Sequence, residues 1–81
     1  MDERIRNIIA ALEELSNDPA VPKNVKTRIE NSINYLKNEE DLSISVNKAL
    51  NELDEIADDT NMESFTRTQI WNIVSMLEII R

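Results

Sequence analysis

The segment IRNIIAALEEL, residues 5–15, carries apolar side chains at the spacing that places them on one face of an α-helix. These side chains are Ile5, Ile8, Ile9, Leu12 and Leu15. The residues Asn17-Asp18-Pro19 then end the helix, because proline cannot continue a helix and disfavours helical backbone at the residue before it. We therefore expect a helix from about Asp2 to this proline, with a single buried stripe.

The next segment repeats the helical spacing. It starts at Val21-Pro22, where Pro22 suits the first helical position, and it ends near Asn38-Glu39-Glu40. Its expected buried stripe is Val25, Ile29, Ile33 and Leu36, with Tyr35 beside it.

Two further helices are expected in the second half of the chain. Either Asp41 or Ser43 can cap the third by accepting hydrogen bonds from free N–H groups, and this helix ends at residues 58–61. Its expected stripe is Val46, Ala49, Leu50, Leu53 and Ile56. The fourth extends from about Glu63 to Ile80. No segment alternates like a β-strand, so the predicted fold class is all-α.

The chain also matches itself when it is shifted by 41 residues. The shift superposes Leu12 on Leu53, Glu14 on Glu55, Asp18 on Asp59, Thr27 on Thr68, Ile29 on Ile70, Asn31 on Asn72 and Leu36 on Leu77. Helical periodicity accounts for the apolar matches but less well for the polar ones. The sequence thus predicts one helical domain over residues 1–81: a four-helix bundle of two tandem αα-hairpins, about 1–40 and 41–81, with the loops 17–22 and 58–63 at one end.

The composition excludes most catalytic chemistry. The chain has no histidine and no cysteine, which excludes the usual zinc sites, haem ligation, Ser-His-Asp triads and Cys-His dyads. It has no glycine, so no loop can approach phosphates closely in the manner of a P-loop. We expect a non-enzymatic protein with no catalytic residue, no cofactor and no metal.

Charge and hydropathy limit the partners and the location. A net charge of −7 opposes binding to the phosphate backbone of nucleic acids. The longest apolar run, residues 8–12, is far shorter than the ~20 residues that span a membrane. The start, Met1-Asp2-Glu3-Arg4, lacks the basic and then apolar form of a signal peptide. We therefore expect a cytoplasmic protein without a membrane or nucleic-acid partner.

The fourth helix has a wider apolar arc than a surface helix of a small bundle needs. Beyond the expected core positions, Phe65, Met76 and Ile79 extend the arc on one side and Trp71 stands on the other. One interpretation is that this helix is simply the most buried of the four. The other is that Phe65, Trp71, Met76 and Ile79 contribute to an interface with a second copy or a protein partner, since interfaces favour aromatic side chains and methionine.

Two polar clusters are weaker candidates. The acidic loops 17–22 and 58–63 gather oxygen ligands that suit Mg²⁺ or Ca²⁺, although Asp and Asn at such places more often cap helices and form turns. Lys26-Thr27-Arg28 and Thr66-Arg67-Thr68 stand near helix starts and so resemble anion sites, but pairing with the neighbouring acids is the stronger expectation.

Two stretches carry a family resemblance: Val21-Pro22-Lys23-Asn24-Val25-Lys26, and the run from Leu53 to Glu78 that contains Thr66-Arg67-Thr68-Gln69-Ile70-Trp71-Asn72. They resemble uncharacterised protein family UPF0147, a family of small archaeal helical proteins. The chain departs from the family pattern at Glu63, where a proline is expected. The resemblance implies an archaeal, cytoplasmic, compact helical domain, and it implies no activity and no functional residues.

The function most consistent with these observations is a non-enzymatic interaction module that forms a homo-oligomer or binds a protein partner through the fourth helix. One alternative is an accessory of a nucleoprotein or ribosomal assembly, in which this acidic chain would contact a basic protein rather than RNA. A second alternative is a carboxylate-based enzyme, which requires two acids in a concave pocket with divergent pKa values.

Overall fold

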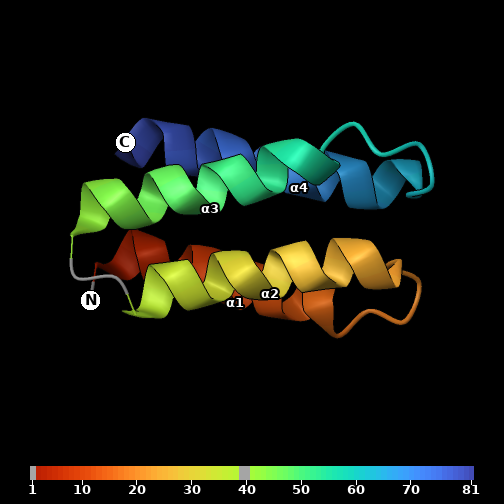
Figure 1. Ribbon diagram of the computed structural model, residues 1–81, viewed down its shortest axis with the longest axis horizontal. Helices are drawn as coiled ribbons and strands as arrows, with labels where there is room; N and C mark the ends of the chain where they lie inside the picture. The colour runs from red at the N-terminus through yellow and green to blue at the C-terminus, as the bar shows by residue number, and fades with distance from the viewer. Residues whose placement is uncertain (1, 39–40) are drawn as a thin grey trace.

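The computed structural model describes residues 2–38 and 41–81 and shows four helices that alternate in direction (Figure 1). They are α1 (Glu3–Ser16), α2 (Lys23–Asn38), α3 (Leu42–Ile56) and α4 (Ser64–Ile80). No strand occurs among the described residues, and the predicted all-α four-helix bundle is confirmed. The expected end of the second helix at Glu39 and Glu40 lies outside the described residues.

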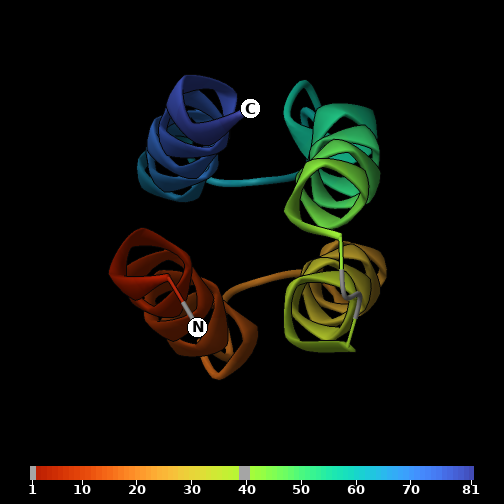
Figure 2. The same ribbon diagram turned by 90° about the vertical axis from the view of Figure 1, so that its left-hand side faces the viewer.

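The helices occupy the corners of a square when the bundle is viewed along its long axis (Figure 2). Helix α1 packs against α2 and α4, and α3 packs against the same two neighbours. The α2–α3 pair is the most closely packed and the α1–α4 pair the least. Both hairpin turns lie at one end of the bundle, as the short loops predict, and both termini of the chain lie at the opposite end (Figure 1).

Local capping sets where the helices begin. Asp2 Oδ1 accepts from the Arg4 N–H at 2.8 Å, and Asp41 Oδ1 accepts from the Ile44 N–H at 3.2 Å, so Asp41 and not Ser43 caps α3. Helix α2 begins at Lys23, one residue later than predicted. Pro22 stands just outside the helix, where its carbonyl oxygen accepts the first intrahelical bond from Lys26 at 2.9 Å. Its fixed φ suits this flanking position as well.

The two hairpin turns make the same hydrogen bonds. In the first, the Asp18 carboxylate accepts from the Ala20 N–H at 2.9 Å and the Asp18 carbonyl accepts from the Val21 N–H at 3.1 Å. In the second, the Asp59 carboxylate accepts from the Asn61 N–H at 2.8 Å and the Asp59 carbonyl accepts from the Met62 N–H at 3.4 Å. Each aspartate therefore closes its turn and delivers a buried side chain, Val21 or Met62, onto the end of the core.

The core consists of the predicted apolar stripes. Every buried side chain of residues 2–38 lies 41 residues before another buried side chain. The pairs are 5 and 46, 8 and 49, 9 and 50, 12 and 53, 15 and 56, 21 and 62, 25 and 66, 29 and 70, 32 and 73, 33 and 74, and 36 and 77. Two hairpins of equal length would share such a pattern without common ancestry, so the tandem duplication itself stays a prediction.

Candidate interaction face on helices α1 and α4

The four side chains predicted for an interface are exposed in the single chain. Phe65 is 68%, Trp71 46%, Met76 38% and Ile79 79% accessible. Helix α4 contributes Ile70, Ile73, Val74 and Leu77 to the core, and Ile80 packs at its edge. The alternative that α4 is simply the most buried helix therefore does not describe this chain, because its apolar arc extends beyond what the bundle covers.

These four residues occupy two different flanks of α4. At 100° per residue, Phe65, Met76 and Ile79 lie within about 60° of one another, whereas Trp71 lies about 140° from Met76. Gln69 and Asn72 fall on the same line of the helix as Phe65, Met76 and Ile79. We call the line Phe65, Gln69, Asn72, Met76 and Ile79 the outer stripe. Trp71 belongs to the opposite flank, so it does not form a single patch with the stripe.

A shallow groove runs along the seam between α1 and α4, beside the outer stripe. One part, of about 210 Å³, is lined mainly by apolar side chains: Arg4, Asn7, Ile8, Met76, Ile79 and Ile80. A second part, of about 180 Å³, is lined by Ala11, Glu14, Gln69, Asn72, Ile73 and Met76. Met76 lines both parts and joins them into what we call the α1–α4 groove. Each part is smaller than the ~300 Å³ at which small-molecule pockets begin, so the groove suits protruding side chains.

Arg4, which lines the apolar part of this groove, is paired with an acid. Arg4 Nη2 lies 3.1 Å from Asp2 Oδ2, and the Arg4 side-chain hydrogen bond lowers the pKa of the Asp2 carboxyl. The same contact raises the pKa of the Arg4 guanidinium. The apolar part of the groove thus presents little net charge.

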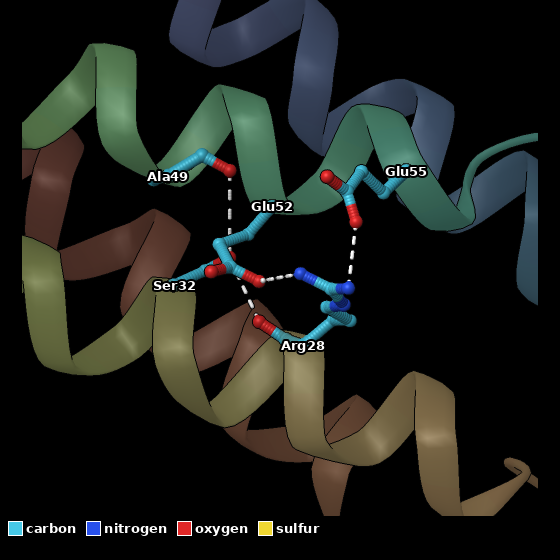
Figure 3. A network of polar contacts seen from close by, with 5 residues as sticks. All are labelled: Arg28, Ser32, Ala49, Glu52 and Glu55. Atoms are coloured by element: carbon cyan, nitrogen blue, oxygen red, sulfur yellow. Dashed lines mark hydrogen bonds and ion pairs between the residues drawn. The ribbon is translucent and has the colours of Figure 1, made fainter.

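The opposite seam, between α2 and α3, is closed by polar contacts (Figure 3). Arg28 lies 3.0 Å from Glu52 and 2.6 Å from Glu55, and the hydrogen bond to Glu52, followed by the charge of Glu55, raises the pKa of Arg28. The buried Ser32 hydroxyl donates to the Arg28 carbonyl oxygen at 3.0 Å and lies 3.4 Å from the Ala49 carbonyl oxygen. Such a small side chain lets the two backbones come close.

A cation–π contact reinforces the same seam. Lys48 Nζ lies 5.6 Å from the centre of the Tyr35 ring, within the range of this attraction. The α2–α3 seam is therefore held by both charge and close packing.

When the sequence is shifted by 41 residues, α2 corresponds to α4 and α3 to α1, so each residue of the α2–α3 seam has a counterpart in the α1–α4 seam. Several of these counterparts differ in charge or size. Gln69 replaces Arg28, Ala11 replaces Glu52, Ile73 replaces Ser32, Met76 replaces Tyr35, and Asn7 replaces Lys48. Among the described residues no ion pair crosses the α1–α4 seam, and the bulkier Ile73 stands where Ser32 allows close approach. The seam consequently stays open, and the part beside Met76, Ile79 and Ile80 is mainly apolar.

Each acidic loop uses one carboxylate in its turn, that of Asp18 or of Asp59. The backbone contacts of Asp18 and Asp59 are those of the two turns, and Asp59 Oδ2 also accepts from Asn24 Nδ2 at 3.3 Å. Within residues 2–38 and 41–81, no three acidic side chains gather closely enough to hold a metal ion.

Three side chains of the segments proposed for an anion make internal contacts: Thr27, Arg28 and Thr68. Arg28 pairs with the acids of α3, and the hydroxyls of Thr27 and Thr68 donate to the carbonyl oxygens of Lys23 and Ser64 at 3.1 and 3.0 Å. Thr66 is 4% exposed and belongs to the core, because it continues the buried line of α4 towards Ile70. Thr66 is therefore not available as part of the weaker anion alternative.

A third hollow, of about 270 Å³, lies between α1 and α2 and bears on the enzyme alternative. It is lined by Glu13, Ser16, Asn17, Glu30, Ile33 and Asn34. Both of its carboxylates are exposed to solvent, and Glu13 lies 3.3 Å from Lys37. Acid–base catalysis by two carboxylates relies on environments that move their pKa values apart, whereas both carboxylates of this hollow are open to solvent.

Sequence reasoning missed two exposed apolar residues and one wall of the groove. Leu42 and Ile44, near the start of α3, are 42% and 45% accessible. The groove wall on α1 includes Asn7 and Ala11, which lie outside the apolar stripe. The groove wall can be found by comparing residues that are 41 positions apart, because this comparison shows where uncharged residues replace a charged pair.

The fold and this face define a small four-helix bundle with exposed apolar side chains on α4. The model of uncharacterised protein family UPF0147 matches residues 1–80. A UPF0147 protein of Metallosphaera sedula is 41% identical to this chain, over 99% of this chain and 91% of the length of that protein. A UPF0147 protein of Methanocaldococcus jannaschii is 38% identical, over 99% of this chain and 87% of the length of that protein. This chain belongs to UPF0147.

A solved structure has the same fold. The crystal structure of the unknown-function protein MMP1188 is 44% identical to this chain, with a TM-score of 0.91 over 98% of this chain and 91% of its own. None of the described helices is long and apolar enough to cross a membrane.

Proposed function

We propose that this protein is a non-enzymatic, cytoplasmic interaction module that binds a protein through the outer stripe and the adjoining α1–α4 groove. The observation that carries the proposal is the exposure of Phe65 and Ile79, 68% and 79%, on a helix whose other face supplies the core. Both side chains lie on one line with Met76, and Met76 and Ile79 also line the groove.

The physical driving force would be burial of this apolar surface. Covering a Phe or Ile side chain contributes roughly 1.5–3 kcal/mol, so Phe65 and Ile79 together supply an energetic centre for binding. The acidic remainder of the surface, with a net chain charge of −7, would disfavour partners that bring acidic side chains against it.

The test is affinity purification of the tagged protein from its native cells, with the double variant F65S/I79S beside the unaltered chain. A partner recovered at near-stoichiometric yield by the unaltered chain and lost with the variant supports the proposal. The control is I44S, which removes an apolar residue of 45% exposure from α3 and should keep the partner. Equal recovery by all three proteins contradicts the proposed face.

The same purification distinguishes the nucleoprotein alternative. Nuclease treatment should leave a partner bound through the outer stripe in place. Partners that disappear after nuclease treatment, and that dissociate steeply with added salt, instead favour an accessory of a nucleoprotein or ribosomal assembly.

A further inference from the structure

We propose that the occupant of the outer stripe is a second copy of this chain, with the two α4 helices antiparallel and a two-fold axis passing near Asn72. This inference rests on the proposed function and names its partner. Its first support is spacing: Phe65, Gln69, Asn72, Met76 and Ile79 follow one another at intervals of 4, 3, 4 and 3 residues. Helices that pack along a shared seam use this spacing.

The two ends of the stripe match when it is reversed about Asn72, whereas Gln69 and Met76, three and four residues from Asn72, do not superpose. Phe65 and Ile79 each lie seven residues from Asn72 and are its most exposed apolar members. In an antiparallel pair centred on Asn72, Phe65 of each copy meets Ile79 of the other, and the two Asn72 amides face each other. A two-fold interface requires this kind of self-complementarity, and a polar residue at one seam position is a known means of fixing the register.

The stripe does not place like charges against each other when two copies meet on it. Two chains of net charge −7 repel each other at long range, so a self-contact has to use an uncharged part of the surface. The outer stripe is uncharged, and the charged residues within α4, Arg67 and Glu78, are turned about 100° or more from it. A basic partner would find no carboxylate in the stripe, whereas an identical copy needs none.

The available area fits a weak dimer. Phe65 and Ile79 are about 21 Å apart along the helix at 1.5 Å per residue. The face formed by α4 and α1 is roughly 20 Å wide, from helix diameters and axial spacing. Two such faces bury roughly 800 Å² in total, which is less than the ~1,200–2,000 Å² of stable specific interfaces and falls among weak, transient ones. Dimerisation should therefore depend on concentration.

The first test uses disulfide formation, because the chain has no cysteine of its own. Asn72→Cys should form a disulfide-linked dimer on mild oxidation, since residues at a two-fold axis come within the ~7 Å Cα separation that a disulfide permits. The control is Asn51→Cys, an exposed asparagine of α3. Several-fold more linked dimer from N72C than from N51C supports the proposal, and equal amounts overturn it.

The second test reads the register by sedimentation. The unaltered chain should sediment faster as concentration rises, and F65K and I79E should each remain monomeric, with helical content unchanged by circular dichroism. Mixing F65K with I79E should restore a dimer, because position 65 of one copy faces position 79 of the other. No recovery in the mixture overturns the antiparallel register.

An unaltered chain that stays monomeric throughout overturns the second copy as occupant. The proposed function would still stand if affinity purification recovers a different protein through the same stripe.

Discussion

Replacing two isoleucines of α4 separates the side chains that hold the bundle together from those on the outer stripe. Ile70 is completely buried and Ile79 is 79% exposed, so Ile70→Ala and Ile79→Ala remove the same atoms from opposite environments. Ile70→Ala should cost about 2–5 kcal/mol, from lost transfer energy and the cavity left behind. Ile79→Ala should change the stability of the monomer by less than about 0.5 kcal/mol.

The expected loss is large for a chain of this size. An 81-residue domain has a free energy of unfolding of about 4–12 kcal/mol. A loss of about 3 kcal/mol at Ile70 lowers Tm by roughly 12–24 °C. Urea and thermal unfolding, followed by circular dichroism and by the fluorescence of the single tryptophan, Trp71, measure both variants in dilute solution.

Measuring Ile70→Ala and Ile79→Ala at low and high protein concentration gives a second readout. Because dimerisation stabilises the folded chain by mass action, Ile79→Ala should lose stability relative to the unaltered protein only when both are concentrated. A cost for Ile79→Ala in dilute solution that equals the cost for Ile70→Ala refutes the reasoning, since Ile79 would then be packed within the monomer.

Three smaller predictions follow from the caps and turns. Asp18→Ala and Asp59→Ala should each lower stability by about 1 kcal/mol in urea unfolding, because each removes the acceptor that closes a turn; a neutral result at both positions contradicts that role. Because the folded-state pKa of Asp2 is lowered, the stabilisation by its ionised carboxyl is fully present above the unfolded pKa of about 3.9 and is lost as pH falls through the folded pKa. The difference in Tm between Asp2→Asn and the unaltered chain at neutral pH should accordingly shrink below about pH 4. Addition of Ca²⁺ or Mg²⁺ should leave Tm unchanged, since the carboxylates of the turns bind backbone N–H groups; a rise in Tm would reveal a cation site.

Periodicity in the sequence determined the helices and their buried faces. The stripe from Ile5 to Leu15 is buried as predicted, because an apolar residue every three or four positions produces a one-sided helix whatever its neighbours are. The same local rule separated Trp71 from Phe65 and Met76 on α4. Caps are local as well, although the choice of Asp41 over Ser43 and the place of Pro22 required the backbone itself.

The difference between the two seams was decided by the tertiary structure. Ser32 lies in a closed seam and Met76 in an open one because each faces a particular neighbour: Ser32 the Ala49 carbonyl, and Met76 the α1 wall at Ala11. Periodicity within one helix describes that helix alone, whereas closing a seam depends on pairs of side chains far apart in the chain, such as Arg28 and Glu52. The sequence by itself determined which side of each helix is apolar, and only the packing of four helices decided which apolar surface was left uncovered.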